Sequence, residues 1–117
     1  MLTYSDRRID CDDGAIVVRG YYFPLGTKRI PYESIRGAVI VPMPTASAGK
    51  WRIWGTANPG LWASFDPQRS RKTEALILDL GKRVKPFLTP DDLGAVAQVI
   101  HARTGLNVTR QDRPVVI

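Results

Sequence analysis

The chain contains one cysteine, Cys11, and one histidine, His101, which are residue types that often pair in nucleophilic catalysis. A catalytic pair would require these two side chains to meet in the fold. We expect His101 to lie in the last turn of a helix, where a histidine commonly has a structural role. Four serines are considered as nucleophiles, and none stands in a nucleophile motif: Ser34, Ser47, Ser64 and Ser70. The sequence therefore predicts a protein that is not an enzyme.

Metal and phosphate sites have little support in the sequence. One histidine and one cysteine cannot build a usual zinc site. Asp10, Asp12 and Asp13 lie close together but lack the spacing of a calcium loop, so we interpret them as solvated turn residues. Gly55 and Gly60 are isolated, and no Gly-Lys-Ser/Thr sequence follows a glycine-rich loop. We predict no metal and no cofactor.

Tryptophans and cations gather in the middle of the chain. Trp51, Trp54 and Trp62 lie near several arginines, which is typical of proteins that bind single-stranded nucleic acid. The alternative, which we favour, is that the tryptophans fill the core. Nucleic acid is disfavoured because the common OB-fold barrel places its helix between strands. The candidate residues for binding an anionic surface are Lys28, Arg29, Arg52, Arg69, Arg71 and Lys72.

Composition indicates one globular domain. The chain has 117 residues, of which 44% are hydrophobic and 24% charged, with a formal net charge of +6. This charge allows an anionic partner without requiring one. A single cysteine excludes an intrachain disulfide, and the start of the sequence lacks an apolar signal core. The longest apolar run, residues 38–41, is far shorter than the roughly 20 residues of a membrane helix. We expect a cytoplasmic protein, either free or at the membrane periphery.

Most of the chain has the patterns of β-strands, bounded by glycine- and proline-containing turns. In the strand at residues 73–80, Leu76 and Leu78 share one face while Ala75 and Ile77 share the other, so both faces should be covered. Pro86 predicts that residues 83–88 form an edge strand or a bulge. The expected strands are residues 7–11, 15–22, 27–31, 35–41, 61–65, 73–80 and 83–88, with a single turn at residues 32–34. Residues 51–56 are expected to form either a strand or a tight irregular segment.

One helix is expected near the C-terminus, at residues 89–103. Thr89 is the predicted N-cap, followed by Pro90 at the first helical position, and Gly105 is placed to end the helix. An apolar stripe at helical spacing should dock the helix on the sheets: Leu93, Val96, Ala97 and Ile100. Residues 106–117 are expected to form a tail that is either disordered or added to a sheet edge.

Several segments resemble a known family. Residues 30–35, Ile-Pro-Tyr-Glu-Ser-Ile, are similar to a motif of bacterial pleckstrin-homology-like (PH-like) domains, and residues 88–93, Leu-Thr-Pro-Asp-Asp-Leu, resemble their strand-to-helix junction. Residues 52–55 with Trp62 and Phe65 are similar to the middle of that family. The resemblance covers about Thr3 to Arg103. It implies a PH-like domain at residues 1–105, a mainly β barrel of two packed antiparallel sheets that is capped by the helix.

The resemblance also implies a binding or scaffolding role without catalytic residues. The first hairpin turn carries Asp10, Asp12 and Asp13, where phosphoinositide-binding relatives place basic residues. Relatives in bacteria often form oligomers, so a protein partner or a homo-oligomer is the expected partner. We predict self-association through the edge at residues 83–88 or through the tail. The alternatives are an anionic lipid surface or nucleic acid bound by the basic residues, and an enzyme of unknown type.

Overall fold

A computed structural model gives the structure of the chain and describes residues 3–22, 26–43, 60–63, 69 and 72–112. The described part is mainly β with one helix near the C-terminus, which confirms the predicted fold class. Its elements are β1 (Tyr4–Ser5), β2 (Ile9–Cys11), β3 (Ala15–Tyr22), β4 (Gly26–Pro31), the 3-10 helix η1 (Tyr32–Ser34), β5 (Gly37–Pro42), β6 (Leu61–Ala63), β7 (Glu74–Asp79), β8 (Lys85–Leu88), α1 (Leu93–Thr104) and β9 (Thr109–Arg110).

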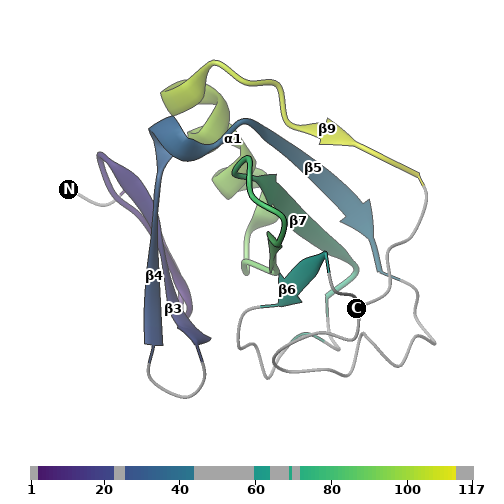
Figure 1. Cartoon of the computed structure of the whole chain (residues 1–117), viewed down its shortest axis with the longest axis horizontal. Coiled ribbons are helices and arrows are strands. Elements are labelled where there is room, and N and C mark those ends of the chain that lie inside the picture. Colours follow the sequence, from purple (N-terminus) through teal and green to yellow (C-terminus); the bar gives the residue numbers. More distant parts are fainter. Residues whose placement is uncertain (1–2, 23–25, 44–59, 64–68, 70–71, 113–117) are drawn as a thin grey trace.

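The strands form two sheets. Sheet A has the order β1-β2-β3-β4 with antiparallel neighbours, and sheet B has the order β6-β8-β7-β5-β9. Helix η1 connects the two sheets, and α1 lies beside it at one end of them (Figure 1). The main core fills the space between the sheets and the helix. Its members come from sheet A (such as Ile16 and Ile30), from sheet B (Leu76) and from α1 (Ile100).

Sheet A follows the sequence pattern closely. The β-branched and aromatic run at Ala15–Tyr22 forms β3 with the predicted bounds. In β4, Ile30 is buried and Arg29 is exposed, as expected where successive side chains point to opposite faces. The single turn expected at Tyr32–Ser34 is present as η1.

Sheet B is covered on both faces, as its leucine-rich strand predicts. Leu76 and Leu78 of β7 belong to the main core, whereas Ala75 and Ile77 belong to a second cluster on the opposite face. Phe87 is fully buried in that second cluster. A single strand therefore links two separate hydrophobic cores.

The prediction that residues 83–88 form an edge strand is wrong. Strand β8 lies between β6 and β7, and β6 pairs with it in parallel, with Trp62 opposite Pro86. Pro86 is tolerated there because the pairing between β8 and β7 covers only Phe87 and Leu88. Proline has no amide hydrogen to donate, but Pro86 lies outside the residues that pair β8 with β7, so the ladder between these strands loses no hydrogen bond.

Part of the tail adds to a sheet edge, which was one of its two expected states. Thr109 and Arg110 form β9, which runs parallel to β5 opposite Val39 and Ile40. The amide of Gln111 donates to the Ile40 carbonyl at 3.0 Å, and the Arg110 guanidinium pairs with the Glu74 carboxylate. This segment therefore covers an edge that could otherwise pair with another chain.

The N-cap of the helix lies three residues later than predicted. Asp92, not Thr89, caps α1, and its side chain accepts a hydrogen bond from the Ala95 amide at 3.0 Å. The Asp91 amide donates to the Asp6 carboxylate at 3.0 Å, and the Asp92 amide donates to the Tyr4 hydroxyl at 2.9 Å. In a helix that starts at Thr89 these two amides would lie in the first turn and have no backbone partner within the helix, whereas here Asp6 and Tyr4 accept from them.

The predicted apolar stripe faces the core. Val96 and Ile100 are fully buried, and Leu93 and Ala97 are partly buried against the same cluster. Val99, which the stripe did not include, is also buried. With twelve residues, α1 is too short to cross a membrane, and no helix in the described ranges is long and apolar enough to do so.

Two glycines of the helix should respond oppositely to alanine. Gly105 ends α1 with a φ of 75°, and Gly105→Ala should lower the free energy of unfolding by about 1–2 kcal/mol because an alanine is strained there. Gly94 lies inside the helix, where a Cβ would meet only the Asp92 carboxylate at 3.6 Å. Gly94→Ala should therefore raise that free energy by about 0.5–1 kcal/mol. Urea unfolding measures both, and changes of the same sign would contradict this description.

Candidate functional site

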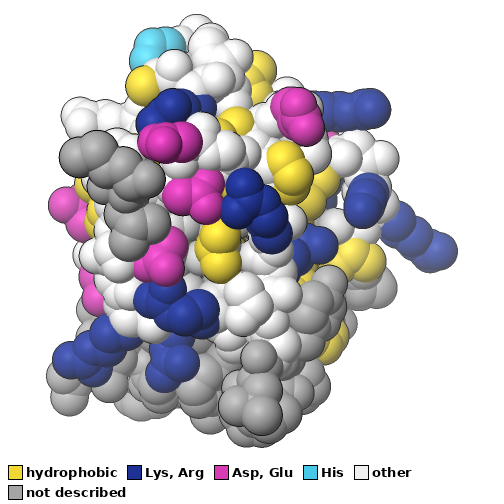
Figure 2. All heavy atoms as spheres, turned by 90° about the vertical axis from the view of Figure 1, so that its left-hand side faces the viewer, with side chains coloured by type: hydrophobic (Ala, Val, Ile, Leu, Met, Phe, Trp, Pro, Cys, Tyr) yellow, Lys and Arg dark blue, Asp and Glu magenta, His cyan; other side chains and the backbone are white. Residues whose placement is uncertain are grey.

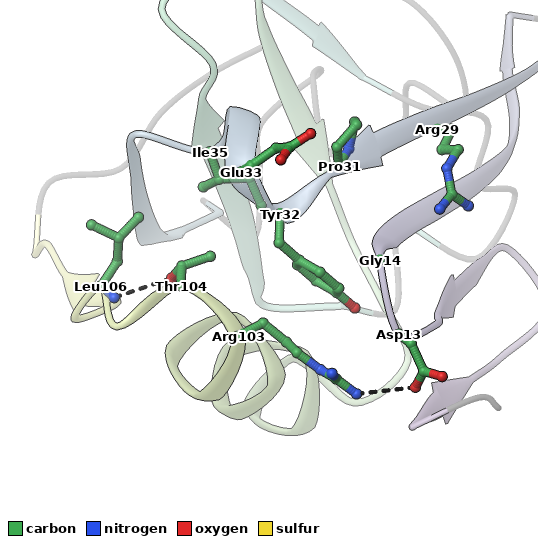
Figure 3. A pocket seen from close by; sticks show the side chains of 10 residues that line it. All are labelled: Asp13, Gly14, Arg29, Pro31, Tyr32, Glu33, Ile35, Arg103, Thr104 and Leu106. Carbon is green, nitrogen blue, oxygen red and sulfur yellow. Dashed lines mark hydrogen bonds and ion pairs between the residues drawn. The ribbon is translucent and has the colours of Figure 1, made fainter.

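A cavity lies between the end of β4, η1 and the C-terminal end of α1 (Figure 3). We call it the β4 cleft, and its volume is about 770 Å³. Both charged and apolar residues line it. The lining residues are Asp13, Gly14, Arg29, Pro31, Tyr32, Glu33, Ile35, Arg103, Thr104 and Leu106.

Two arginine–aspartate pairs organise the cleft. The Arg29 guanidinium lies 2.9 Å from the Asp12 carboxylate, and that of Arg103 lies 3.2 Å from Asp13, as the dashed line in Figure 3 marks. Hydrogen bonds from the Gly14 amide and from Arg29 lower the pKa of Asp12 below its usual value. The pairs stand at the surface, where water and salt screen an ion pair and leave it little net stabilising effect. A ligand carboxylate can therefore replace either aspartate at small cost.

Tyr32 forms the floor between the two pairs. Its ring is buried, and its hydroxyl donates to the Asp12 carbonyl at 2.8 Å. Burial raises the pKa of Tyr32 above its ordinary value, so the hydroxyl remains a neutral donor. The described lining contains no serine, cysteine or histidine.

The residues considered for catalysis lie in different surroundings. Cys11 is fully buried, and burial raises the pKa of its thiol to about 11. The exposed His101 ring contacts the Leu106 carbonyl through Nδ1 at 2.9 Å. No three histidine, cysteine, aspartate or glutamate side chains gather at one point in the described ranges. The three acids of the first turn pair with arginines instead: Asp10 with Arg19, Asp12 with Arg29, and Asp13 with Arg103.

Four of the six predicted anion-binding cations lie in the described residues, and they face different surroundings. The Lys28 ammonium lies 5.4 Å from the centre of the Tyr21 ring, whereas Arg29 faces the β4 cleft. Arg69 is fully buried, with its guanidinium 5.8 Å from the Phe87 ring centre. The side chain of Lys72 contacts the Thr89 carbonyl and lies 3.1 Å from the Asp91 carboxylate. Arg52 and Arg71 lie outside the described residues.

The face shown in Figure 2 carries lysine and arginine side chains interspersed with acidic ones. This face is therefore not uniformly basic. Trp62, one of the three tryptophans expected to fill the core, is partly buried against the main core. Its Nε1 donates to the Tyr21 carbonyl at 2.9 Å. Trp51 and Trp54 lie outside the described residues.

Sequence reasoning did not find the β4 cleft. Arg103 and its partner Asp13 are 90 residues apart in the chain. No local sequence pattern predicts a contact between residues so far apart in the chain. Comparison of the chain with protein-family models, with curated proteins and with solved structures found no match.

Proposed function

We propose that this chain is a non-enzymatic interaction module that binds an extended segment of a protein partner along β4. We also propose that it is a PH-like domain. The order of a four-stranded antiparallel sheet, a second sheet and a helix at one end supports that assignment. The single observation that carries the binding proposal is that β4, six residues long, lies at the edge of sheet A within the described residues.

The hydrogen-bond register indicates which groups of β4 a partner would use. The Tyr32 amide donates to the Gly14 carbonyl, one pair beyond the Ala15–Pro31 pair of the ladder. Because antiparallel pairs alternate, Ile30 and Lys28 bond toward β3, and the backbone of Thr27 and Arg29 points outward. A partner strand would bond to these two residues and thereby extend the sheet.

Charge favours an acidic partner segment over a second copy of the chain. Two β4 strands paired antiparallel through Thr27 and Arg29 would place the two Lys28 side chains opposite each other. Such a like-charge pair is destabilising, whereas glutamate or aspartate opposite Lys28 and Arg29 is favourable. The end of an acidic strand would also reach the β4 cleft. There a carboxylate of the strand could replace Asp12 beside Arg29 or Asp13 beside Arg103.

A pair of probe peptides tests this proposal. An eight-residue peptide of alternating glutamate and valine should shift the amide NMR signals of Thr27 and Arg29, and the lysine–valine counterpart should not. Arg29→Glu should weaken binding of the acidic peptide about fivefold, as expected for a change of about 1 kcal/mol in a cross-strand pair.

Arg83→Glu is the matched control, because it removes the same charge from an exposed residue before β8. It should leave the affinity within about twofold, a margin below 0.5 kcal/mol. Signal shifts confined to other strands, or equal effects of the two variants, would refute the β4 site. A dimer mass in light scattering on the full chain would identify a second copy as the occupant instead of an acidic segment.

A further inference from the structure

A second cavity lies between the inner face of sheet A and the β7–β8 side of sheet B. We call it the inter-sheet pocket, and its volume is about 470 Å³. Its apolar wall consists of Tyr21, Trp62, Leu80, Val84 and Pro86. This volume lies within the range of small-molecule sites, about 300–1,000 Å³.

Two aromatic rings shape the wall. The ring centres of Tyr21 and Trp62 are 6.4 Å apart, and their planes are inclined by 44°. The indole Nε1 of Trp62 donates to the Tyr21 carbonyl at 2.9 Å, which fixes the orientation of the indole. Since this donor is already engaged, Trp62 offers a bound molecule apolar ring surface.

Val84 lies at the exposed side of the same pocket. Its side chain is 42% exposed, and it is the only large hydrophobic residue in the described ranges with this degree of exposure. Isolated apolar side chains on a surface need no explanation. Val84 differs because it continues a wall formed by two aromatic rings and Leu80.

The only charged residues that line this pocket within the described part are Lys28 and Lys82. The Lys28 ammonium lies 5.4 Å from the centre of the Tyr21 ring, so it stands beside the apolar wall. Lys82 is exposed in the turn between β7 and β8. An apolar wall with two cations complements a molecule with an apolar body and an anionic head.

We propose that the inter-sheet pocket binds a small amphipathic carboxylate. The apolar body lies against Tyr21, Trp62 and Val84, and the carboxylate lies between the ammonium groups of Lys28 and Lys82. A neutral apolar molecule would lack the head group, and an apolar cation would be repelled. The pocket shares Lys28 with the proposed strand site, but its apolar wall is formed by residues outside β4, and the backbone of Thr27 and Arg29 points outward, so this inference does not depend on peptide binding by β4.

Titration of the full chain with decanoate tests the inference, with decanol and decyltrimethylammonium as matched probes of the same chain length. Decanoate should shift the Nε1–H signal of Trp62 and should bind about tenfold more tightly than decanol, because two surface ion pairs add to the same apolar contact. Decyltrimethylammonium should bind more weakly than decanol. Equal affinity for the three probes, or decanoate binding that leaves the Trp62 signal unchanged, would overturn the proposal.

Variants separate the role of charge from that of apolar contact. The double variant Lys28→Gln/Lys82→Gln should reduce decanoate affinity to that of decanol and leave decanol binding unchanged. Lys85→Gln is the control, because Lys85 is an exposed cation of β8 that lines a different cavity. Val84→Ser should weaken decanoate and decanol alike. A loss of decanoate affinity in Lys85→Gln equal to that in the double variant would refute the assigned head-group site.

Discussion

Replacement of Ile100 by alanine is expected to lower the free energy of unfolding by about 2–5 kcal/mol, the range for a large-to-small change in a core. Ile100 is fully buried on α1 and belongs to the cluster that joins both sheets to the helix. The free energy of unfolding of a typical domain is about 5–15 kcal/mol, so this single change removes a large fraction of it. Urea unfolding followed by circular dichroism measures the loss.

Gln98→Ala is the matched control for Ile100→Ala, since Gln98 is exposed on the same helix. It should alter the free energy of unfolding by no more than about 0.5 kcal/mol. If the two variants lost the same small amount, α1 would not be docked on the sheets, and the packing described for the main core would be wrong.

Asp6→Asn is expected to lower the free energy of unfolding by about 2–3 kcal/mol, because a charged acceptor of several hydrogen bonds is replaced by a neutral one. The Asp6 carboxylate accepts from the amides of Arg8 at 2.7 Å, Ile9 at 2.8 Å and Asp91 at 3.0 Å. It also accepts from the Tyr4 hydroxyl. An asparagine keeps one acceptor oxygen but loses the charge and the second oxygen.

The contribution of Asp6 should depend on pH in a defined direction. Burial raises the pKa of Asp6, but the hydrogen bonds from Tyr4 and from the three amides outweigh it, so the pKa is lowered overall. A carboxyl with a lower pKa in the folded state stabilises fully above its unfolded pKa of about 3.9 and loses this effect as the pH falls through the folded pKa. The difference between wild type and Asp6→Asn should therefore shrink below about pH 4.

Unfolding measured at a series of acidic pH values checks this dependence. Asp12, whose pKa is also lowered, titrates in both proteins, so its effect cancels in the difference. Tyr4→Phe is the control that keeps the carboxylate and removes only the hydroxyl. A difference between wild type and Asp6→Asn that stays constant down to pH 2 would contradict the assigned role of the carboxylate.

Local patterns predicted the elements whose boundaries depend on nearby residues. The bounds of β3 follow from a β-branched run between two turns, and the helix ends at Gly105 because glycine adopts the left-handed conformation there. The start of the helix depends on Tyr4 and Asp6, which hydrogen bond to amides 88 and 85 residues away. A pattern around Thr89 carries no information about those partners.

The candidate sites could not be predicted for the same reason. The inter-sheet pocket combines Tyr21 of β3, Trp62 of β6 and Val84 before β8, which are separated in the sequence and meet only when the sheets face each other. The edge assignment failed because parallel pairing of β6 with β8 has no local signature. Pro86 limits the hydrogen bonds that β8 can make, but the order of strands in the sheet determines that β6 and β7 lie beside it.

The contacts of Tyr4 and Asp6 with the start of α1 bear on how the nascent chain acquires its structure. Because these hydrogen bonds join residues 85 to 88 positions apart, the first strand cannot complete them until Asp91 and Asp92 have left the ribosome. Contacts over such separations slow folding, since a long loop must close before they form. Much of the first sheet is therefore synthesised before the groups that fasten it to the helix exist, and the docking of sheet A on the helix must follow the synthesis of Asp91 and Asp92.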